Sequence, residues 1–143
     1  MNKIDSWMTF LIVCGFLAAI SIMDPAYLGD DNNFLEQFVN HNFLSFMGIF
    51  VTITLASTAN IHIELRRKER KAGEDFLPKT RAAVRKSAFS LILALFLSLI
   101  AVVVKPLLPS GDLWSALANS FVLSIIFWSF LVVWDITKLA FKI

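Results

Sequence analysis

The sequence is poor in the residues that build metal and redox centres. It has one cysteine, Cys14, and two histidines, His41 and His62, among 143 residues. A lone cysteine excludes an intramolecular disulfide and a zinc site made of cysteines alone. The two histidines lie at opposite ends of one expected helix, roughly 30 Å apart at about 1.5 Å per residue, so they cannot share a metal ion within one chain. We therefore predict no cofactor and no metal site.

Motifs of enzymes are missing as well. The sequence contains no HExxH, no Walker motif and no GxGxxG. Serines are common in the apolar runs, but no histidine or lysine lies in the middle of a run to activate them. A carboxylate at that depth, which a proton-coupled transporter normally carries, is also missing. We predict no catalytic residues and a protein that is not an enzyme, and we rank a small transporter behind the two functions described below.

Apolar residues dominate the composition. The chain is 57% hydrophobic with a mean hydropathy of +0.71, whereas soluble domains are usually about 45–50% apolar. Four apolar runs come close to the roughly 20 residues that a membrane-spanning helix needs; they cover residues 7–23, 43–65, 87–104 and 114–134. The sequence therefore predicts one all-α domain over residues 1–143 with four transmembrane helices.

The first apolar run has a second interpretation. Lys3 precedes it and Ala19-Ile20-Ser21 fits a cleavage site, as in a cleaved signal peptide. The run exceeds the usual apolar core of such a peptide, and Asp5 interrupts its basic start. We favour a retained helix.

Positive charge is concentrated between the second and third runs. Nine of the thirteen lysines and arginines lie in residues 66–86, and short loops rich in these residues stay on the cytoplasmic face of a membrane. Adding Lys3, Lys138 and Lys142 gives twelve basic residues inside, against Lys105 alone outside. We predict a multi-pass membrane protein with both termini in the cytoplasm.

Residues 66–86 are expected to form a cytoplasmic helical hairpin. The second helix should continue past the membrane through Lys71 and stop at Gly73, and Pro78 suits the first turn of the third helix. Attraction to anionic lipid headgroups, about 1 kcal/mol per basic residue near the surface, is the ordinary consequence. Docking of a cytosolic protein is the sharper hypothesis, and direct nucleic-acid binding is disfavoured because only Phe76 could stack on a base. The candidate partner-binding residues are Arg66, Arg67, Arg70, Lys71, Lys79, Arg81 and Arg85.

The second run carries two stripes at helical spacing. A ridge of small residues would let another helix approach closely. A polar stripe overlaps it, and polar groups in hydrocarbon need partners, so this stripe should face protein or water. Hydrogen bonding between helices is the simpler interpretation, and a water-lined pore is the alternative. The ridge is Gly48, Thr52, Ala56 and Asn60, and the stripe is Thr54, Ser57, Asn60 and Glu64.

Small residues also recur along the other two runs. In the third run they form a heptad seam, and in the fourth run they form a ridge. We expect these faces to pack on other helices, Lys105 to extend its ammonium to the outer headgroups, and Asp135 to pair with Lys138. The seam is Ser87, Ser90, Ala94, Ser98 and Ala101, and the ridge is Ala116, Ser120 and Ser124.

The loop between the first two runs is acidic and contains no lysine or arginine. Asp24-Pro25 should end the first helix, and Asn33 with Glu36 is typical of a capping box. Residues 34–40 are then expected to form a short amphipathic helix on the outer membrane surface or on the outer mouth of the bundle. An early first turn of the next helix is the alternative. The candidate sensing residues are Phe34, Leu35, Phe38 and Val39.

Four short spans, a basic inner hairpin and an acidic, aromatic outer loop form a layout that resembles small four-helix membrane subunits of bacterial anti-phage systems, of the kind found in Kiwa. The resemblance covers the whole chain as architecture, and no motif carries it, so it assigns no functional residues. It implies assembly in the bacterial inner membrane and work with a cytosolic partner.

Two functions follow as expectations. The first is an oligomeric inner-membrane scaffold or sensor subunit, in contact with membrane lipids, that recruits a cytosolic protein through its hairpin; the resemblance adds antiviral defence as its setting. Ridges on three of the four spans indicate contacts between copies, hence a homo-oligomer. The second is an oligomeric pore or channel-forming effector lined by Thr54, Ser57 and Asn60.

Overall fold

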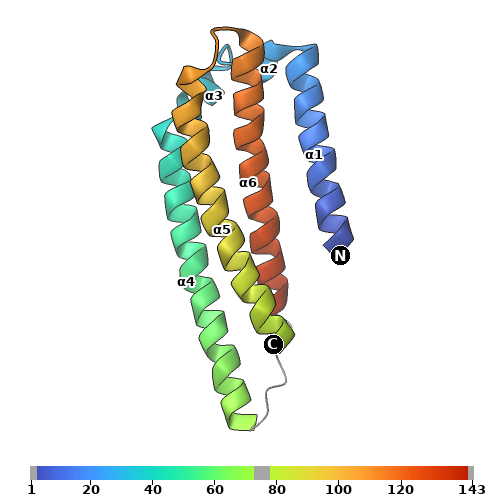
Figure 1. The fold of residues 1–143 in the computed structure, drawn as a ribbon, viewed down its shortest axis with the longest axis vertical. Helices are drawn as coiled ribbons and strands as arrows, with labels where there is room; N and C mark the ends of the chain where they lie inside the picture. The colour runs from blue at the N-terminus through green and yellow to red at the C-terminus, as the bar shows by residue number, and fades with distance from the viewer. Residues whose placement is uncertain (1–2, 73–77, 142–143) are drawn as a thin grey trace.

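Four long helices make up most of the chain (Figure 1). The computed structural model describes residues 3–72 and 78–141, and every regular element in these ranges is helical. The long helices are α1 (Lys3–Met23), α4 (His41–Ala72), α5 (Pro78–Val104) and α6 (Asp112–Phe141). Each is long and apolar enough to cross a membrane. The prediction of an all-α membrane protein with four spans is confirmed.

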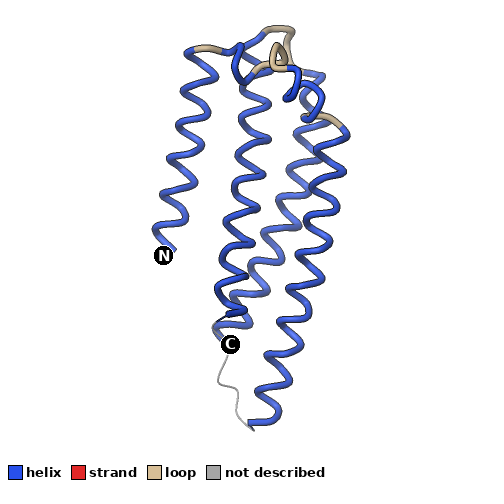
Figure 2. Tube along the Cα trace, turned by 180° about the vertical axis from the view of Figure 1, so that it is seen from behind, coloured by secondary structure: helices blue, strands red, loops and turns tan. Residues whose placement is uncertain are grey.

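Three short elements gather at one end of the bundle, here named the cap end (Figure 2). They are α2 (Pro25–Leu28), α3 (Asn33–Phe38) and the 3-10 helix η1 (Lys105–Leu107). Proline explains two of the boundaries, because it disfavours helix in the residue before it. α1 ends just before Asp24-Pro25, as predicted, and α5 gives way to η1 just before Pro106.

α6 lies at the centre of the arrangement. It packs between α1 and α5, while α4 packs mainly on α5, and the two ribbon views agree that α1 stands on the far side of α6 from α4 (Figures 1 and 2). The spanning part of α6 is 44% buried and that of α1 only 6%. Most of the surface of α1 therefore faces outward.

The core combines large side chains of α4 with small ones of α5 and α6. Phe43, Met47 and Val51 of α4 are fully buried, as are the small residues Ala94 and Ser98 of α5. The predicted seam of the third run therefore faces the interior, and Ala116 and Ser120 place the predicted ridge of the fourth run there as well. Small residues on one side leave room for bulky ones on the other.

α1 is attached to α6 at two levels. Near the cap end, Ser21 is fully buried, and its Oγ lies 2.6 Å from Oγ of Ser120 and donates to the carbonyl of Ala116 at 3.2 Å. Near the start of α1, the rings of Trp7 and Phe10 contact Trp128, with centroids 5.2 and 5.0 Å away. Ser21, one of the residues in the possible cleavage site, is thus part of the packed structure.

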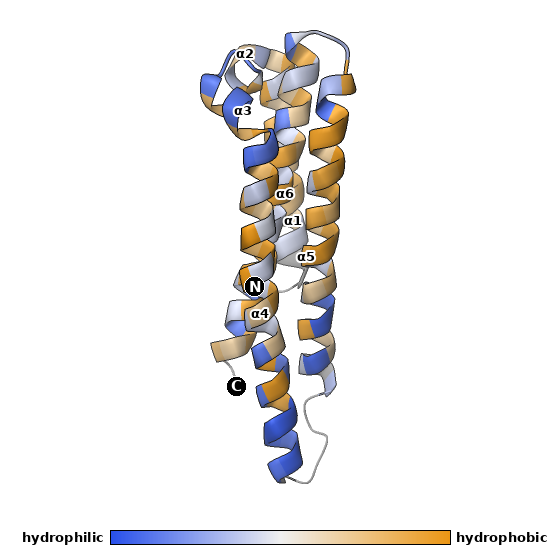
Figure 3. Ribbon diagram, turned by 90° about the vertical axis from the view of Figure 1, so that its left-hand side faces the viewer, coloured by the Kyte–Doolittle hydropathy of each residue, from blue (hydrophilic) through white to orange (hydrophobic). Residues whose placement is uncertain are grey.

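The long helices differ in length, and α4 and α5 carry the described part of the charged segment of residues 66–86 beyond the end of α1. α1 has 21 residues and α4 has 32, or about 32 and 48 Å at 1.5 Å per residue. α1 alone matches the hydrocarbon thickness of about 30 Å. α4 and the start of α5 extend further, and Figure 3 shows that this extension is the hydrophilic part of both helices. We name it the basic end.

Candidate functional site

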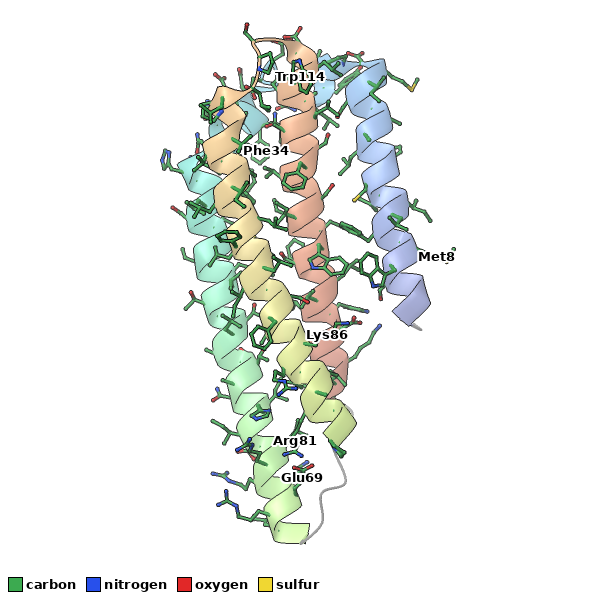
Figure 4. The ribbon with its side chains drawn as sticks, viewed as in Figure 1. Met8, Phe34, Glu69, Arg81, Lys86 and Trp114 are labelled. Carbon is green, nitrogen blue, oxygen red and sulfur yellow. The ribbon has the colours of Figure 1, made fainter. Side chains whose placement is uncertain are left out.

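The basic end is held together by an ion pair between its two helices. Nε of Arg81 on α5 lies 3.3 Å from Oε2 of Glu69 on α4, and the Glu69 side chain is only 8% exposed. Figure 4 shows both side chains between the helices. Leu65 and Val84 are buried close by in sequence. Arg81, a candidate partner-binding residue, is therefore part of the interhelical contact, and Glu69 is a structural residue that the sequence did not single out.

α4 continues as a helix through Lys71, as predicted, and presents cations on its outward face. Arg66, Arg67, Arg70 and Lys71 are all exposed. The first three, together with Ile63, line a shallow depression of about 320 Å³. Nη1 of Arg67 donates to Oε1 of Glu64 at 3.0 Å, and both side chains are more than half exposed, so the pair contributes little to stability.

Part of the predicted hairpin lies outside the described residues. This applies to residues 73–77, which include the expected helix stop at Gly73, and to the side chain of Lys79. Pro78 is the first residue of α5, as predicted. Of the candidate partner-binding residues, Arg66, Arg67, Arg70, Lys71 and Arg85 are described and exposed.

A second depression lies between α4 and α5. Its volume is about 260 Å³, and residues from both helices line it. We name it the interhelical groove; its lining residues are His62, Arg66, Pro78, Arg81, Ala82 and Arg85. Three guanidinium groups and an imidazole converge there, so the groove is suited to an anion.

The hydroxyls of the polar stripe bond within α4 itself. Thr54 Oγ1 donates to the carbonyl of Phe50 at 2.8 Å, and Ser57 Oγ donates to the carbonyl of Ile53 at 3.0 Å. Thr52 Oγ1 on the ridge does the same to Gly48 at 2.7 Å. These hydroxyls therefore have partners without another helix or water, contrary to the hydrogen bonding between helices that the sequence suggested.

The small-residue ridge of α4 faces away from the other helices of the chain. A Cβ atom on Gly48 would meet nothing within 4 Å, and Thr52, Ala56 and Asn60 are exposed. Asn60 differs from the hydroxyl residues, because its amide makes no hydrogen bond within the described part of the chain. Glu64, the last member of the stripe, is exposed and pairs with Arg67.

The segment near the cap end is a separate short helix, so the alternative of an early turn of α4 is wrong. Asn32, not Asn33, caps α3, because its Oδ1 accepts from the backbone N–H groups of Phe34 and Leu35 at 3.1 and 3.4 Å. The predicted capping box is therefore wrong, because with Asn32 as the cap the third helical residue is Leu35, whose side chain is apolar.

The apolar residues of this segment differ in how deeply they are buried. Leu35 and Val39 are buried in the core, whereas Phe34 is 68% exposed. The ring of Phe34 stacks on half-buried Phe38 with centroids 5.5 Å apart. Figure 4 shows Phe34 near the cap end. Of the predicted sensing residues, Phe34 has the most exposed surface.

Sequence reasoning missed a polar network at the cap end. Nζ of Lys105 lies 2.7 Å from Oδ1 of Asp30, and Nδ2 of Asn119 donates to the same oxygen at 3.2 Å and to the carbonyl of Leu28 at 2.8 Å. Lys105 is thus paired with Asp30 instead of reaching to headgroups. The available signal was that Lys105 is the only lysine or arginine predicted on the outer side, where the acidic loop is also predicted to lie.

The expected pair at the end of α6 also takes a different form. Nζ of Lys138 lies over the ring of Trp134, 5.2 Å from its centroid. Among the described residues, Asp135 forms no ion pair with it. Within the same part of the chain, no group of three or more histidine, cysteine, aspartate or glutamate residues could hold a metal ion.

Comparison with known protein families, curated proteins and solved structures found no match. The function proposed below therefore rests on the contacts and charges of this chain.

Proposed function

We propose that this protein is an oligomeric membrane scaffold or sensor subunit that recruits a cytosolic protein through its basic end. One observation carries the proposal: α4 and α5 continue beyond the apolar spans as a charged pair of helices joined by Glu69 and Arg81. A rigid cationic projection next to a membrane is suited to a partner with an acidic surface, because complementary charge speeds encounter and selects the partner.

The outward face of α4 is the part of this projection best placed for docking. Arg67 and Arg70 are exposed there, whereas Arg81 is engaged with Glu69. Reversing both charges as Arg67→Glu/Arg70→Glu should release a co-purifying soluble protein and leave membrane insertion intact. Lys86→Glu/Lys138→Glu is the matched control, since it reverses two charges at the same end without touching this face. Equal release by both variants, or by neither, contradicts the assignment.

The proposed location is the bacterial inner membrane, with the basic end and both termini in the cytoplasm. The charge distribution supports it, because Lys105 is the only lysine or arginine assigned to the outer side. The test uses Lys71→Cys and Asp31→Cys, each introduced singly into a Cys14→Ser chain at an exposed position, and treats intact cells with an impermeant thiol reagent. Labelling at position 31 and protection at position 71 are expected. The reverse pattern contradicts the orientation and the docking surface together.

Asn60 supports the proposal of a homo-oligomer. It lies six residues before Arg66, or about 9 Å deeper at 1.5 Å per residue, and its exposed amide has no partner in the described chain. An amide at this depth gains most from a second polar group, and the adjacent ridge of Gly48, Thr52 and Ala56 lets another copy approach. Asn60→Leu should lower the oligomer mass in detergent, with Thr52→Val as the control.

A pore is the second candidate, favoured by the same exposed amide. Its test is a dye assay of membrane potential on expression, comparing the natural chain with Ser57→Leu and Asn60→Leu. Loss of depolarisation in these variants would support a pore, and unchanged depolarisation would remove the stripe as its lining. The defence setting rests on the resemblance of layout alone, and a phage plaque assay with and without the protein tests it.

A further inference from the structure

We infer that the interhelical groove binds the phosphate of an anionic membrane lipid, with the lipid's acyl chains lying along α4 and α5. The inference does not depend on a protein partner or on oligomer formation. It rests on three features: the convergence of cations from two helices, the ion pair that fixes them, and the apolar surface beside the groove.

The groove presents cations in a geometry suited to phosphate. Arg66 enters it from α4, and Arg81 and Arg85 enter it from α5. Guanidinium groups are planar forks that bind phosphate oxygens through paired, charge-assisted hydrogen bonds. The carboxylate of Glu69 lies beside Arg81. Among the described residues that line the groove, Arg66 and Arg85 add two further positive charges.

Two further features prepare the groove for an anion. The contact between Glu69 and Arg81 joins the helices at this level, so the groove exists before any ligand arrives. Pro78, the first residue of the 27-residue helix α5, is part of the lining. The first turn of a helix carries partial positive charge from its unpaired N–H groups. The backbone therefore adds to the side-chain charge.

The surroundings favour a lipid over a soluble phosphate. Phe89 and Ile92 lie four and seven residues after Arg85, which places them on the same face of α5, and they are 65% and 49% exposed. On α4, Ala59 lies three residues before His62 and is exposed as well. An apolar path thus leads from the cations toward the middle of the spans. Only a ligand with an acyl chain would cover it, and basic pockets between transmembrane helices are known to bind lipid headgroups.

The other depression at the basic end is less suited to this role. Ile63, Arg66, Arg67 and Arg70 all belong to α4, so no second helix fixes their relative positions. Arg70 is therefore a useful control: it carries the same charge at the same end of the bundle but does not line the interhelical groove. Lys86 is the corresponding control on α5, because it is exposed and does not line the interhelical groove.

The test is lipid retention by the purified full-length chain in a neutral detergent, measured by native mass spectrometry. The probes are dioleoylphosphatidylglycerol, dioleoylphosphatidylcholine and inorganic phosphate. We expect the natural chain to retain phosphatidylglycerol in preference to phosphatidylcholine. Arg66→Gln/Arg85→Gln should weaken phosphatidylglycerol binding about thirtyfold, the effect of two basic residues near an anionic headgroup. The matched control Arg70→Gln/Lys86→Gln, which also removes one charge from each helix, should weaken it less than about threefold.

A third variant separates charge from geometry and guards against misfolding. Arg66→Lys/Arg85→Lys keeps both charges but loses the planar guanidinium groups. Its affinity for phosphatidylglycerol should lie between that of the natural chain and that of Arg66→Gln/Arg85→Gln. Equal losses in the two glutamine variants would mean diffuse surface attraction and would overturn the site. Equal retention of the two lipids would overturn it as well. If millimolar inorganic phosphate displaced the lipid, the ligand would be a soluble anion and the assignment to lipid would be wrong.

Discussion

Asn119→Leu tests the polar network that fastens the cap end to the long helices. Asn119 is fully buried on α6, and its Nδ2 donates both to the carbonyl of Leu28 and to Oδ1 of Asp30. Leucine has a similar size but no donor. The substitution therefore removes two hydrogen bonds that hold the segment around Leu28 and Asp30 to α6. The bond from the Asp30 N–H to Ser115 Oγ and the ion pair from Lys105 to Asp30 remain.

The magnitude follows from the partners. The bond to the Leu28 carbonyl is worth about 1 kcal/mol, and the bond to the Asp30 carboxylate about 1.5 kcal/mol, at the low end because the Asp30 side chain is 41% exposed. Oδ1 of Asn119 is buried without a hydrogen-bond partner in the described structure. Because an unpaired buried acceptor is destabilising, its removal offsets part of the stability lost with the two bonds. We expect a net loss of about 2 kcal/mol, which lowers the unfolding temperature by about 4–8 °C for a chain of this size.

Thermal unfolding in detergent, followed by tryptophan fluorescence, measures this loss. Ser124→Ala is the control: among the described residues, the Ser124 Oγ donates to the carbonyl of Ser120 on the same helix and to no other helix, so the substitution should cost less than about 0.5 kcal/mol. In an Asp30→Ala background the Asn119→Leu effect should shrink by about 1 kcal/mol. An unfolding temperature unchanged by Asn119→Leu, or an undiminished effect in that background, would refute the reasoning.

Three further substitutions test the other contacts by the same unfolding assay. Gly29→Ala should cost about 1–3 kcal/mol, because its Cβ would lie 2.7 Å from the Pro25 carbonyl oxygen; a neutral result would mean that the turn adapts. The control is Gly111→Ala, whose Cβ would make an ordinary contact with the Trp114 side chain at 3.8 Å. Trp128→Ala should lower the free energy of unfolding by about 1–2 kcal/mol, because it removes two ring contacts with α1. Trp134→Ala, at an exposed tryptophan, should lower it less; equal effects would mean that the ring contacts do not attach α1 to α6. Glu69→Gln should cost about 2 kcal/mol by removing a buried carboxylate from its cation, whereas Glu64→Gln, in an exposed pair, should cost almost nothing.

The helices and their ends could be read from the sequence because the constraints on them are local. The thickness of a bilayer sets the length of each apolar run, and proline limits helix at Asp24-Pro25 and Pro106 wherever these lie in the fold. The helix cap at Asn32 was harder to predict from the sequence, because both Asn32 and Asn33 suit the cap position. The choice is made by the turn before it, in which Asn32 N–H donates to the Gly29 carbonyl and Asn32 Nδ2 to that of Tyr27.

The contacts between helices could not be read in this way. Asp30 meets Lys105 and Asn119 across 75 and 89 residues of sequence, and nothing local in either segment selects the other. Helical spacing shows which residues share a face but not which face meets a neighbour. α4 turns its large residues Phe43 and Met47 inward, where the small seam of α5 leaves room for them, and so its own small ridge faces outward.

The hydroxyl bonds within α4 also change the balance between scaffold and pore. A helix whose threonines and serines donate to their own backbone carbonyls meets lipid at little cost, since no donor is left unpaired. In the membrane-spanning part of the stripe, the unsatisfied polarity is thereby reduced to Asn60. One amide in each copy needs one partner, and the same amide of a neighbouring copy can supply it across a close contact between ridges. A water-filled path needs exposed polar groups that are free to bind water, yet the exposed hydroxyls of Thr52 and Ser57 donate to backbone carbonyls of α4. Thr54 is half-buried and Thr58 is fully buried. A contact between copies would account for the exposed amide of Asn60, and this favours the proposed scaffold over a pore.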